Sequence, residues 1–243
     1  MKHWFGVGLS GVLILLSVRA EAAVSPVVVE LFESQGCSSC PPAERVMETL
    51  EKEQGRSLIL LTYHVHYWDS LGWKDSFSDS KYTQLQSAYA TIFGQDNIYT
   101  PEMVVQGEVG FNGSDLQEAR REIETRANTP RSAIVMQLKP GAERSVLLSV
   151  NKIPDSSMGS LVAVIYENAD PVAVGRGENR GATMSGRYAV RKIVPLTADS
   201  GSVTITLRRD ATWNPQKLGV AVLVRDEKLA IRSAAAVPWP SVS

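Results

Sequence analysis

Two cysteines separated by two residues are the side chains best suited to chemistry in this 243-residue chain. Cys37 and Cys40 are its only cysteines, and they follow an apolar, β-branched run and a short polar turn. A thiol in the first turn of a helix lies near unpaired backbone N–H groups and about half a positive charge. Both favour the thiolate, which is the nucleophile in disulfide exchange. The spacing therefore indicates a redox-active or ligand-binding pair, with the Cys37 sulfur exposed and Cys40 beneath it, placed to close a disulfide.

Two structural interpretations of this pair are less favoured. A structural zinc site needs four ligands, usually including a second cysteine or histidine pair at set spacing, and the sequence has no further cysteine. A purely structural bridge between Cys37 and Cys40 would close a loop too small to constrain the unfolded chain much. A static disulfide stays as the third alternative, after redox exchange and ligand binding.

His64 and His66 end an apolar run that is typical of a buried strand. Their alternation places both imidazoles on one face of that strand. With Cys37 and Cys40 nearby they could bind copper, because soft sulfur and imidazole are suitable copper ligands. Two such histidines are more often hydrogen-bonded supports for a loop. A copper carrier is therefore an alternative function, and otherwise the sequence predicts no metal and no cofactor.

Pro101 follows a long helical pattern and directly precedes an apolar strand pattern. This position suggests a cis peptide bond between Thr100 and Pro101. Trp68 and Tyr99 belong to a group of aromatic residues in the same part of the chain. These side chains could line a peptide-binding groove, although such groups are more often the packing of a long insertion.

The elements that must position these residues alternate between strand and helix up to Asn128. The predicted strands cover residues 27–32, 57–65, 103–106 and 109–111, and the predicted helices cover 38–54, 78–93 and 115–127. Alternation of this kind argues for an α/β sheet with helices on both faces. It predicts a first domain over residues 24–128.

The pattern changes after Pro130. Short apolar alternations separated by turn residues follow, at 133–138, 145–150, 161–167, 188–195, 203–207, 218–224 and 229–234. Strands at this spacing, without a convincing helix, are typical of an all-β sandwich. The sequence thus predicts an α/β domain followed by an all-β sandwich domain over residues 131–243.

The order of motifs over residues 24–127 resembles thioredoxin: strand, Cys-x-x-Cys helix, strand, helix, Thr-Pro, strand hairpin and helix. The resemblance implies that Thr100 and Pro101 face the cysteine pair and hold the backbone of a bound substrate chain. It also makes Glu30 a candidate proton acceptor for Cys40. Glu30 stands one residue further from Cys37 than the thioredoxin carboxylate does, so an ordinary strand-edge carboxylate is the alternative.

Four blocks of the chain, at residues 30–42, 67–75, 99–105 and 177–181, resemble a bacterial secreted family known as domain of unknown function 1223. This similarity implies a thioredoxin-like fold and supplies no reaction. The last block belongs to a polar, glycine-rich turn, which lacks the following helix of a phosphate-binding loop. Its charged groups either dock on the first domain near the cysteines or form an exposed tip.

Residues 1–22 have the pattern of an export signal. A short basic start precedes an apolar run, and Ala20 and Ala22 form an Ala-x-Ala cleavage site. The apolar run is too short for a good membrane span, so no stable membrane insertion is expected after cleavage. The formal net charge of −1 gives no electrostatic reason to bind nucleic acid or an anionic membrane.

These features together predict a periplasmic or secreted protein, in a compartment where disulfides persist. The preferred function is thiol–disulfide exchange on envelope proteins, in which Cys37 attacks and Cys40 resolves the mixed disulfide. The partners would be the thiols or disulfides of those proteins. The alternatives are a copper-binding carrier and a non-catalytic peptide-binding protein.

Overall fold

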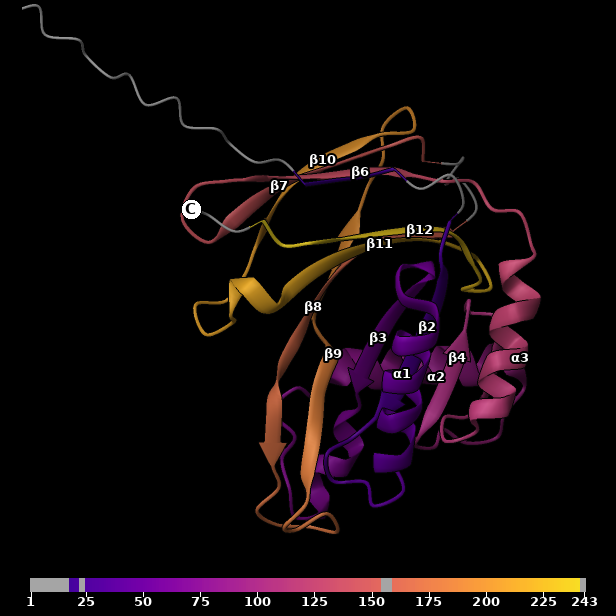
Figure 1. Ribbon diagram of the computed structural model, residues 1–243, viewed down its shortest axis with the longest axis vertical. Coiled ribbons are helices and arrows are strands. Elements are labelled where there is room, and N and C mark those ends of the chain that lie inside the picture. Colours follow the sequence, from indigo (N-terminus) through magenta and orange to yellow (C-terminus); the bar gives the residue numbers. More distant parts are fainter. Residues whose placement is uncertain (1–17, 22–24, 154–158, 241–243) are drawn as a thin grey trace, which may run out of the picture.

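The computed structural model describes residues 18–21, 25–153 and 159–240, and it consists of two sheets and three α-helices (Figure 1). The helices are α1 (Pro41–Gln54), α2 (Ser80–Phe93) and α3 (Leu116–Ala127). The strands are β1 (Val18–Glu21), β2 (Val27–Glu33), β3 (Leu58–His64), β4 (Glu102–Val105), β5 (Val109–Asn112), β6 (Val135–Pro140), β7 (Ser145–Asn151), β8 (Gly159–Ala173), β9 (Thr183–Leu196), β10 (Val203–Arg208), β11 (Leu218–Asp226) and β12 (Ile231–Pro238).

The large sheet has the order β12-β11-β8-β9-β3-β2-β4-β5 and mixes parallel with antiparallel pairs. Strands β2 and β3 run parallel at its centre and are buried along their whole length. Continuous apolar runs suit such strands, because both faces are covered. The second sheet, β1-β6-β7-β10, lies over β11 and β12 (Figure 1).

Alternate side chains of β2 pack against different helices. Val29 and Leu31 lie in one apolar cluster with side chains of α1 and α3, whereas Val28 and Phe32 lie in another with Tyr89 of α2. Residues of opposite parity on a strand point to opposite faces. Helices α1 and α3 therefore cover one face of the central strands, and α2 covers the other.

The predicted fold class, an α/β thioredoxin-like domain followed by an all-β sandwich domain, is wrong. The protein is mostly β, and strands β8, β9, β11 and β12 from its second half continue the same sheet as β2–β5. The two groups meet where β3 lies parallel to β9. Apolar alternation predicts that these segments are strands but does not specify which distant strand each one pairs with.

The change of pattern after Pro130 coincides with the end of α3 at Ala127, and the division into domains 24–128 and 131–243 stays a prediction. Most of the predicted signal segment, residues 1–22, lies outside the described residues. Its described part is β1, which pairs antiparallel with β6. Among the residues that the structure describes, no helix is long and apolar enough to cross a membrane.

Candidate functional site

Cys37 and Cys40 form a disulfide in the loop between β2 and α1, with their Cα atoms 5.5 Å apart. The loop is closed by two backbone hydrogen bonds, in which the Cys37 amide donates to the Ser34 carbonyl at 3.0 Å and the Cys40 amide to the Cys37 carbonyl at 3.2 Å. Helix α1 then begins at Pro41, because proline has no N–H to leave unpaired and its φ angle suits a first helical turn. The sequence therefore fixes both cysteines at the helix start.

Both cysteines are fully buried, so the prediction of an exposed Cys37 sulfur is wrong. Val174 and Met184, from the second half of the chain, pack against them together with Trp68 and Trp73. The indole of Trp73 donates to the Gln35 side-chain oxygen at 3.0 Å. The pair is thus covered by apolar side chains from two distant parts of the sequence.

The predicted cis bond between Thr100 and Pro101 is confirmed. The Thr100 carbonyl lies 3.9 Å from the Cys37 sulfur, and it accepts a hydrogen bond from the Ser39 hydroxyl at 3.3 Å. The Trp68 indole donates to the Thr100 hydroxyl at 2.8 Å. The structure therefore places the Thr100 carbonyl and the Trp68 ring beside the cysteine pair.

Tyr99, the remaining residue predicted to bind substrate, is exposed beside Thr100. Its carbonyl accepts a hydrogen bond from the Gln86 side-chain amide of α2 at 2.6 Å. Its ring contributes one of the larger exposed apolar surfaces among the described residues. Tyr99 thus lies next to the site, with its ring available at the surface.

The turn between β8 and β9, residues 174–182 (the β8–β9 tip), docks on the cysteine loop. The Asn179 side-chain amide donates to the backbone carbonyls of Gln35 at 3.0 Å and Cys37 at 2.7 Å. A carboxylate oxygen of Glu178 accepts from the Ser38 hydroxyl at 2.7 Å and from the Ser38 amide at 3.3 Å. The docking alternative is therefore confirmed for this turn, although neither Glu178 nor Asn179 was individually predicted.

Glu30 lies away from the disulfide. Its side chain points to the α2 face of the sheet, where it accepts hydrogen bonds from Arg225 and from the Tyr89 hydroxyl, each at 2.6 Å. Glu30 has the same parity on β2 as Val28 and Phe32, which also face α2, since residues two apart on a strand share a face. The structure does not bring Glu30 to Cys40.

A second set of ionisable groups, which we call the acidic cluster, lies at the cysteine end of the sheet and consists of Glu33, Glu44, His64 and Asp75. Asp75 Oδ2 is 2.8 Å from His64 Nδ1, and His64 Nε2 is 3.7 Å from a Glu33 oxygen. None of the three carboxyl groups was predicted as a site residue, although Glu33 and Asp75 fall in two of the family-like blocks.

Local electrostatics separate the three carboxyl groups of the acidic cluster. Burial raises the pKa of Glu33 well above its ordinary value, and the charges of Glu44 and Asp75 raise it further. Burial likewise raises the pKa of Glu44 to about 7. Burial alone would raise the pKa of Asp75 too, but the charge and hydrogen bond of His64 and two backbone amides lower it. The cluster therefore combines one carboxyl group with a lowered pKa, that of Asp75, with two whose pKa values are raised, those of Glu33 and Glu44.

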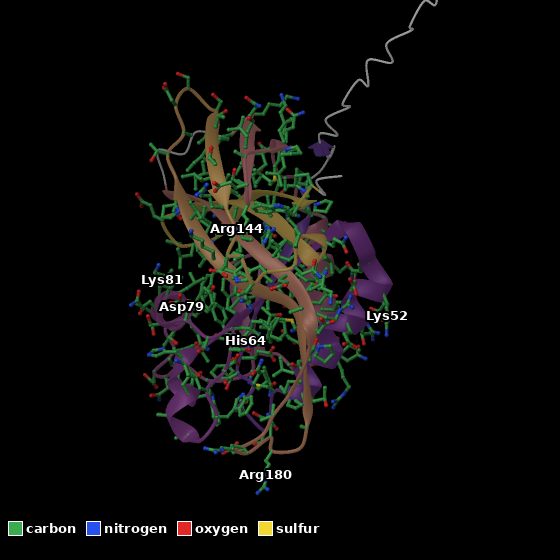
Figure 2. All side chains as sticks on the ribbon, turned by 90° about the vertical axis from the view of Figure 1, so that its left-hand side faces the viewer. Lys52, His64, Asp79, Lys81, Arg144 and Arg180 are labelled. Atoms are coloured by element: carbon green, nitrogen blue, oxygen red, sulfur yellow. A yellow bond between two sulfur atoms is a disulfide. The ribbon has the colours of Figure 1, made fainter. Side chains whose placement is uncertain are left out.

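The two histidines of the alternative copper site have other partners. His64 lies inside the molecule (Figure 2) beside Asp75, and the His66 ring nitrogen is 2.8 Å from the Thr83 hydroxyl. Among the described residues, no group of three or more His, Cys, Asp or Glu side chains is arranged to hold a metal ion. Cys37, Cys40, His64 and His66 are thus not gathered into a metal centre.

Comparison of the sequence with known protein families gives one match. A family model described as "Protein of unknown function (DUF1223)" matches residues 28–225. The chain belongs to this family. The matched residues include the cysteine loop, the Thr100–Pro101 segment and the β8–β9 tip. No curated protein that was compared matches the sequence.

Two solved structures are similar to this one. The X-ray crystal structure of an Agrobacterium tumefaciens protein, a structural genomics target, is 25% identical, with a TM-score of 0.70, and the match covers 92% of this chain and 98% of that one. HBP35 of Porphyromonas gingivalis is 18% identical, with a TM-score of 0.61 over 90% of this chain and 76% of that chain. The first supports the arrangement of the part of the chain that it covers, and the second shows a shared fold alone.

Proposed function

We propose that this member of the DUF1223 family carries out thiol–disulfide exchange through Cys37 and Cys40, acting on the thiols or disulfides of exported proteins. The observation that carries the proposal is the Cys37–Cys40 disulfide at the start of α1, beside the Thr100 carbonyl. A pair three residues apart joins and separates without a large movement of the chain, which suits repeated exchange.

In the reductive direction the chemistry has two steps. The Cys37 thiolate attacks one sulfur of a substrate disulfide, a mixed disulfide forms and the other substrate sulfur leaves as a thiolate. The Cys40 thiolate then attacks the Cys37 sulfur, which releases the second substrate thiolate and closes the Cys37–Cys40 disulfide. The pair has given two electrons to the substrate, and the released thiolates take up the protons. The oxidative direction reverses both steps.

The residues around the pair give the other components of the proposal. The exposed Tyr99 ring and the backbone at Thr100 would receive an extended substrate chain. Because Trp68 and Trp73 pack over the cysteines, the substrate must displace this cover to reach Cys37. Export through the predicted signal at residues 1–22 would place the reaction in the periplasm or outside the cell, where substrate disulfides occur.

The test measures exchange with an oxidised protein substrate, using the chain that starts after residue 22. Wild type should reduce the substrate when a small dithiol regenerates the pair. Cys37→Ala should abolish turnover, and Cys40→Ala should accumulate a mixed disulfide with the substrate because the resolving thiol is missing. Ser87→Ala, on the exposed side of α2, keeps both cysteines and the residues around them, and as the matched control it should retain turnover.

Two results would overturn the proposal. Turnover that is unchanged in Cys37→Ala would place the chemistry elsewhere. A pair that resists reduction, with a potential below about −300 mV, would identify a static structural disulfide.

A further inference from the structure

Glu178 on the β8–β9 tip contacts the residue that follows the attacking cysteine. Its carboxylate accepts hydrogen bonds from both the hydroxyl and the backbone amide of Ser38. Glu178 itself is exposed, and it reaches the loop from a position 140 residues further along the chain. The β8–β9 tip therefore places a carboxylate on the cysteine loop, which this loop's own residues do not supply.

Few backbone donors are available at the start of α1. Pro41 and Pro42 have no N–H, and the Cys40 amide already donates to the Cys37 carbonyl at 3.2 Å. A thiolate at a helix start is stabilised by the free N–H groups there. The amides between the two cysteines belong to Ser38 and Ser39, and Glu178 already accepts from the first of these.

We infer that Glu178 is a positioning residue for the redox pair, which opposes formation of the Cys37 thiolate by occupying the Ser38 amide and by placing a negative charge beside it. The inference rests on the proposed function and deepens it, because it concerns the direction of exchange. The positive end of the α1 dipole favours the thiolate, and Glu178 acts against that effect.

Asn179 fixes the β8–β9 tip, and with it Glu178, against the cysteine loop. Its side-chain amide joins the tip to the carbonyls of Gln35 and Cys37, and it is buried while its neighbour Glu178 is not. Arg180, the next residue, points away from the molecule (Figure 2). The tip thus holds one carboxylate on the cysteine loop and directs the following cation outward.

The consequence for the pair depends on pH. Reduction of the disulfide takes two electrons and two protons to give the dithiol, and a thiol loses its proton only near or above its pKa. Glu178 therefore destabilises the reduced form where Cys37 would ionise and has no such effect at lower pH. By holding Cys37 as the thiol it also slows the attack of Cys37 on a substrate disulfide.

The elements next to the loop carry other ionisable groups, which are the same in every variant below. They are Glu33 on β2, Glu44 on α1, His64 on β3, Asp75 before α2, and Arg176 and Arg180 on the tip. A comparison at one position therefore isolates the contribution of Glu178.

The experiment titrates the Cys37 thiolate by its ultraviolet absorbance, in the reduced protein carrying Cys40→Ser, so that one thiol titrates. Glu178→Gln keeps an acceptor for Ser38 but removes the charge, and it should lower the pKa of Cys37 by about one unit, which is tenfold more thiolate at a pH below that pKa. Glu227→Gln makes the same change on an exposed carboxylate in the turn after β11, at the opposite end of β8 from the tip, and should leave the titration unchanged.

A second measurement uses both cysteines and follows the reduction potential against pH. Glu178→Gln and wild type should agree below the pKa of Cys37. Above it the variant should have the higher potential, by about 30 mV for a tenfold change in the equilibrium constant. A Cys37 titration that is the same in Glu178→Gln as in wild type, or that moves equally in Glu227→Gln, would overturn the inference. Neither measurement needs a substrate, so a failure of the proposed function is seen separately, as absent turnover.

Discussion

Glu30 and Glu33 lie three residues apart on β2, and their side chains are buried on opposite faces in two kinds of charge cluster. Glu30 is paired with Arg225 and hydrogen-bonded to Tyr89. Burial alone would lower the pKa of Arg225, but Tyr89 and Glu30 beside it raise that pKa. One buried cation thus balances one buried carboxylate, and the pair joins β2 to β11 across the sheet.

The acidic cluster around Glu33 has no such balance. Three carboxyl groups, from Glu33, Glu44 and Asp75, share a single imidazole, that of His64. One Glu33 oxygen and the Nε2 atom of His64 are buried without a hydrogen-bond partner among the described residues. A buried carboxyl without a countercharge favours its neutral form. The same residue type on one strand is therefore paired with a cation on one face, and on the other face, next to the cysteine loop, it lies among carboxyl groups that favour its neutral form.

The largest effect expected from this difference is on the balanced pair. Glu30→Gln leaves the Arg225 guanidinium buried without its countercharge, and we expect a loss of about 3–5 kcal/mol in the free energy of unfolding. Urea unfolding at neutral pH measures this loss. The double variant Glu30→Leu with Arg225→Met should lose much less, since no isolated charge remains. A loss below about 1 kcal/mol in the single variant would mean that Arg225 has another partner.

The contrast between these two glutamates also marks the limit of the sequence analysis. Apolar patterns located most elements within a few residues, as for the helix predicted at 115–127 and found at Leu116–Ala127. They did not reveal that Glu30 meets Arg225, 195 residues away, because a strand pattern carries no information about a distant partner strand.

The candidate site was predictable in the same uneven way. Cys37, Cys40 and the Thr100–Pro101 bond belong to short local motifs, and the structure joins the two cysteines and places the Thr100 carbonyl beside the Cys37 sulfur. Glu178 and Asn179 reach the site only through the β8–β9 pairing, so their individual roles had no local signal. The glycine-rich turn around them was the one indication that a distant segment docks there.

The next largest effect should come from Asp75, the residue of the acidic cluster whose pKa is lowered. Asp75 is buried and accepts hydrogen bonds from the amides of Gln35 at 2.8 Å and Phe77 at 2.9 Å, besides its contact with His64. Asp75→Asn replaces one acceptor oxygen with a donor, so we expect a loss of about 2–3 kcal/mol in urea unfolding.

Asp79→Asn is the matched control for this change. The Asp79 side chain accepts from the Lys81 amide as the N-cap of α2, and asparagine caps a helix about as well. The control should stay within about 0.5 kcal/mol of wild type. A loss in Asp75→Asn as small as that expected for the control would contradict the prediction, because it would show that the amide at position 75 finds adequate hydrogen-bond partners.

A smaller effect is the pH dependence of stability that Glu44 confers. Its pKa rises from 4.5 to about 7 in the folded protein, mainly through burial, so the folded state binds more protons than the unfolded state between these values. The stability from this group is complete below pH 4.5 and is lost as the pH rises to about 7. We expect a decrease of about 1–2 kcal/mol over this range, after allowance for partial exposure.

Urea unfolding in steps from pH 5 to pH 8 checks this prediction. Glu44→Gln should flatten the decrease, whereas Glu124→Gln, on the exposed side of α3, should retain it. A decrease of the same size in Glu44→Gln would assign the pH dependence to another group.

The smallest expected effect is at Glu33, and it is the sharpest test of the comparison. Glu33→Gln is the same change as Glu30→Gln, made in a residue that is equally buried. Because burial and the neighbouring carboxyls raise the pKa of Glu33 and so favour its neutral form, an amide of nearly the same shape should alter the unfolding free energy at pH 7 by less than about 1 kcal/mol.

The sign at Glu33 should also depend on pH. Wild type must ionise Glu33 inside the fold as the pH rises past its raised pKa, whereas the amide does not titrate, so Glu33→Gln should become the more stable protein in alkaline solution. Parallel urea unfolding of the two glutamine variants at neutral and alkaline pH measures this directly. A loss at position 33 as large as the loss at position 30 would contradict this prediction, because it would mean that both faces of β2 bury a charged carboxylate.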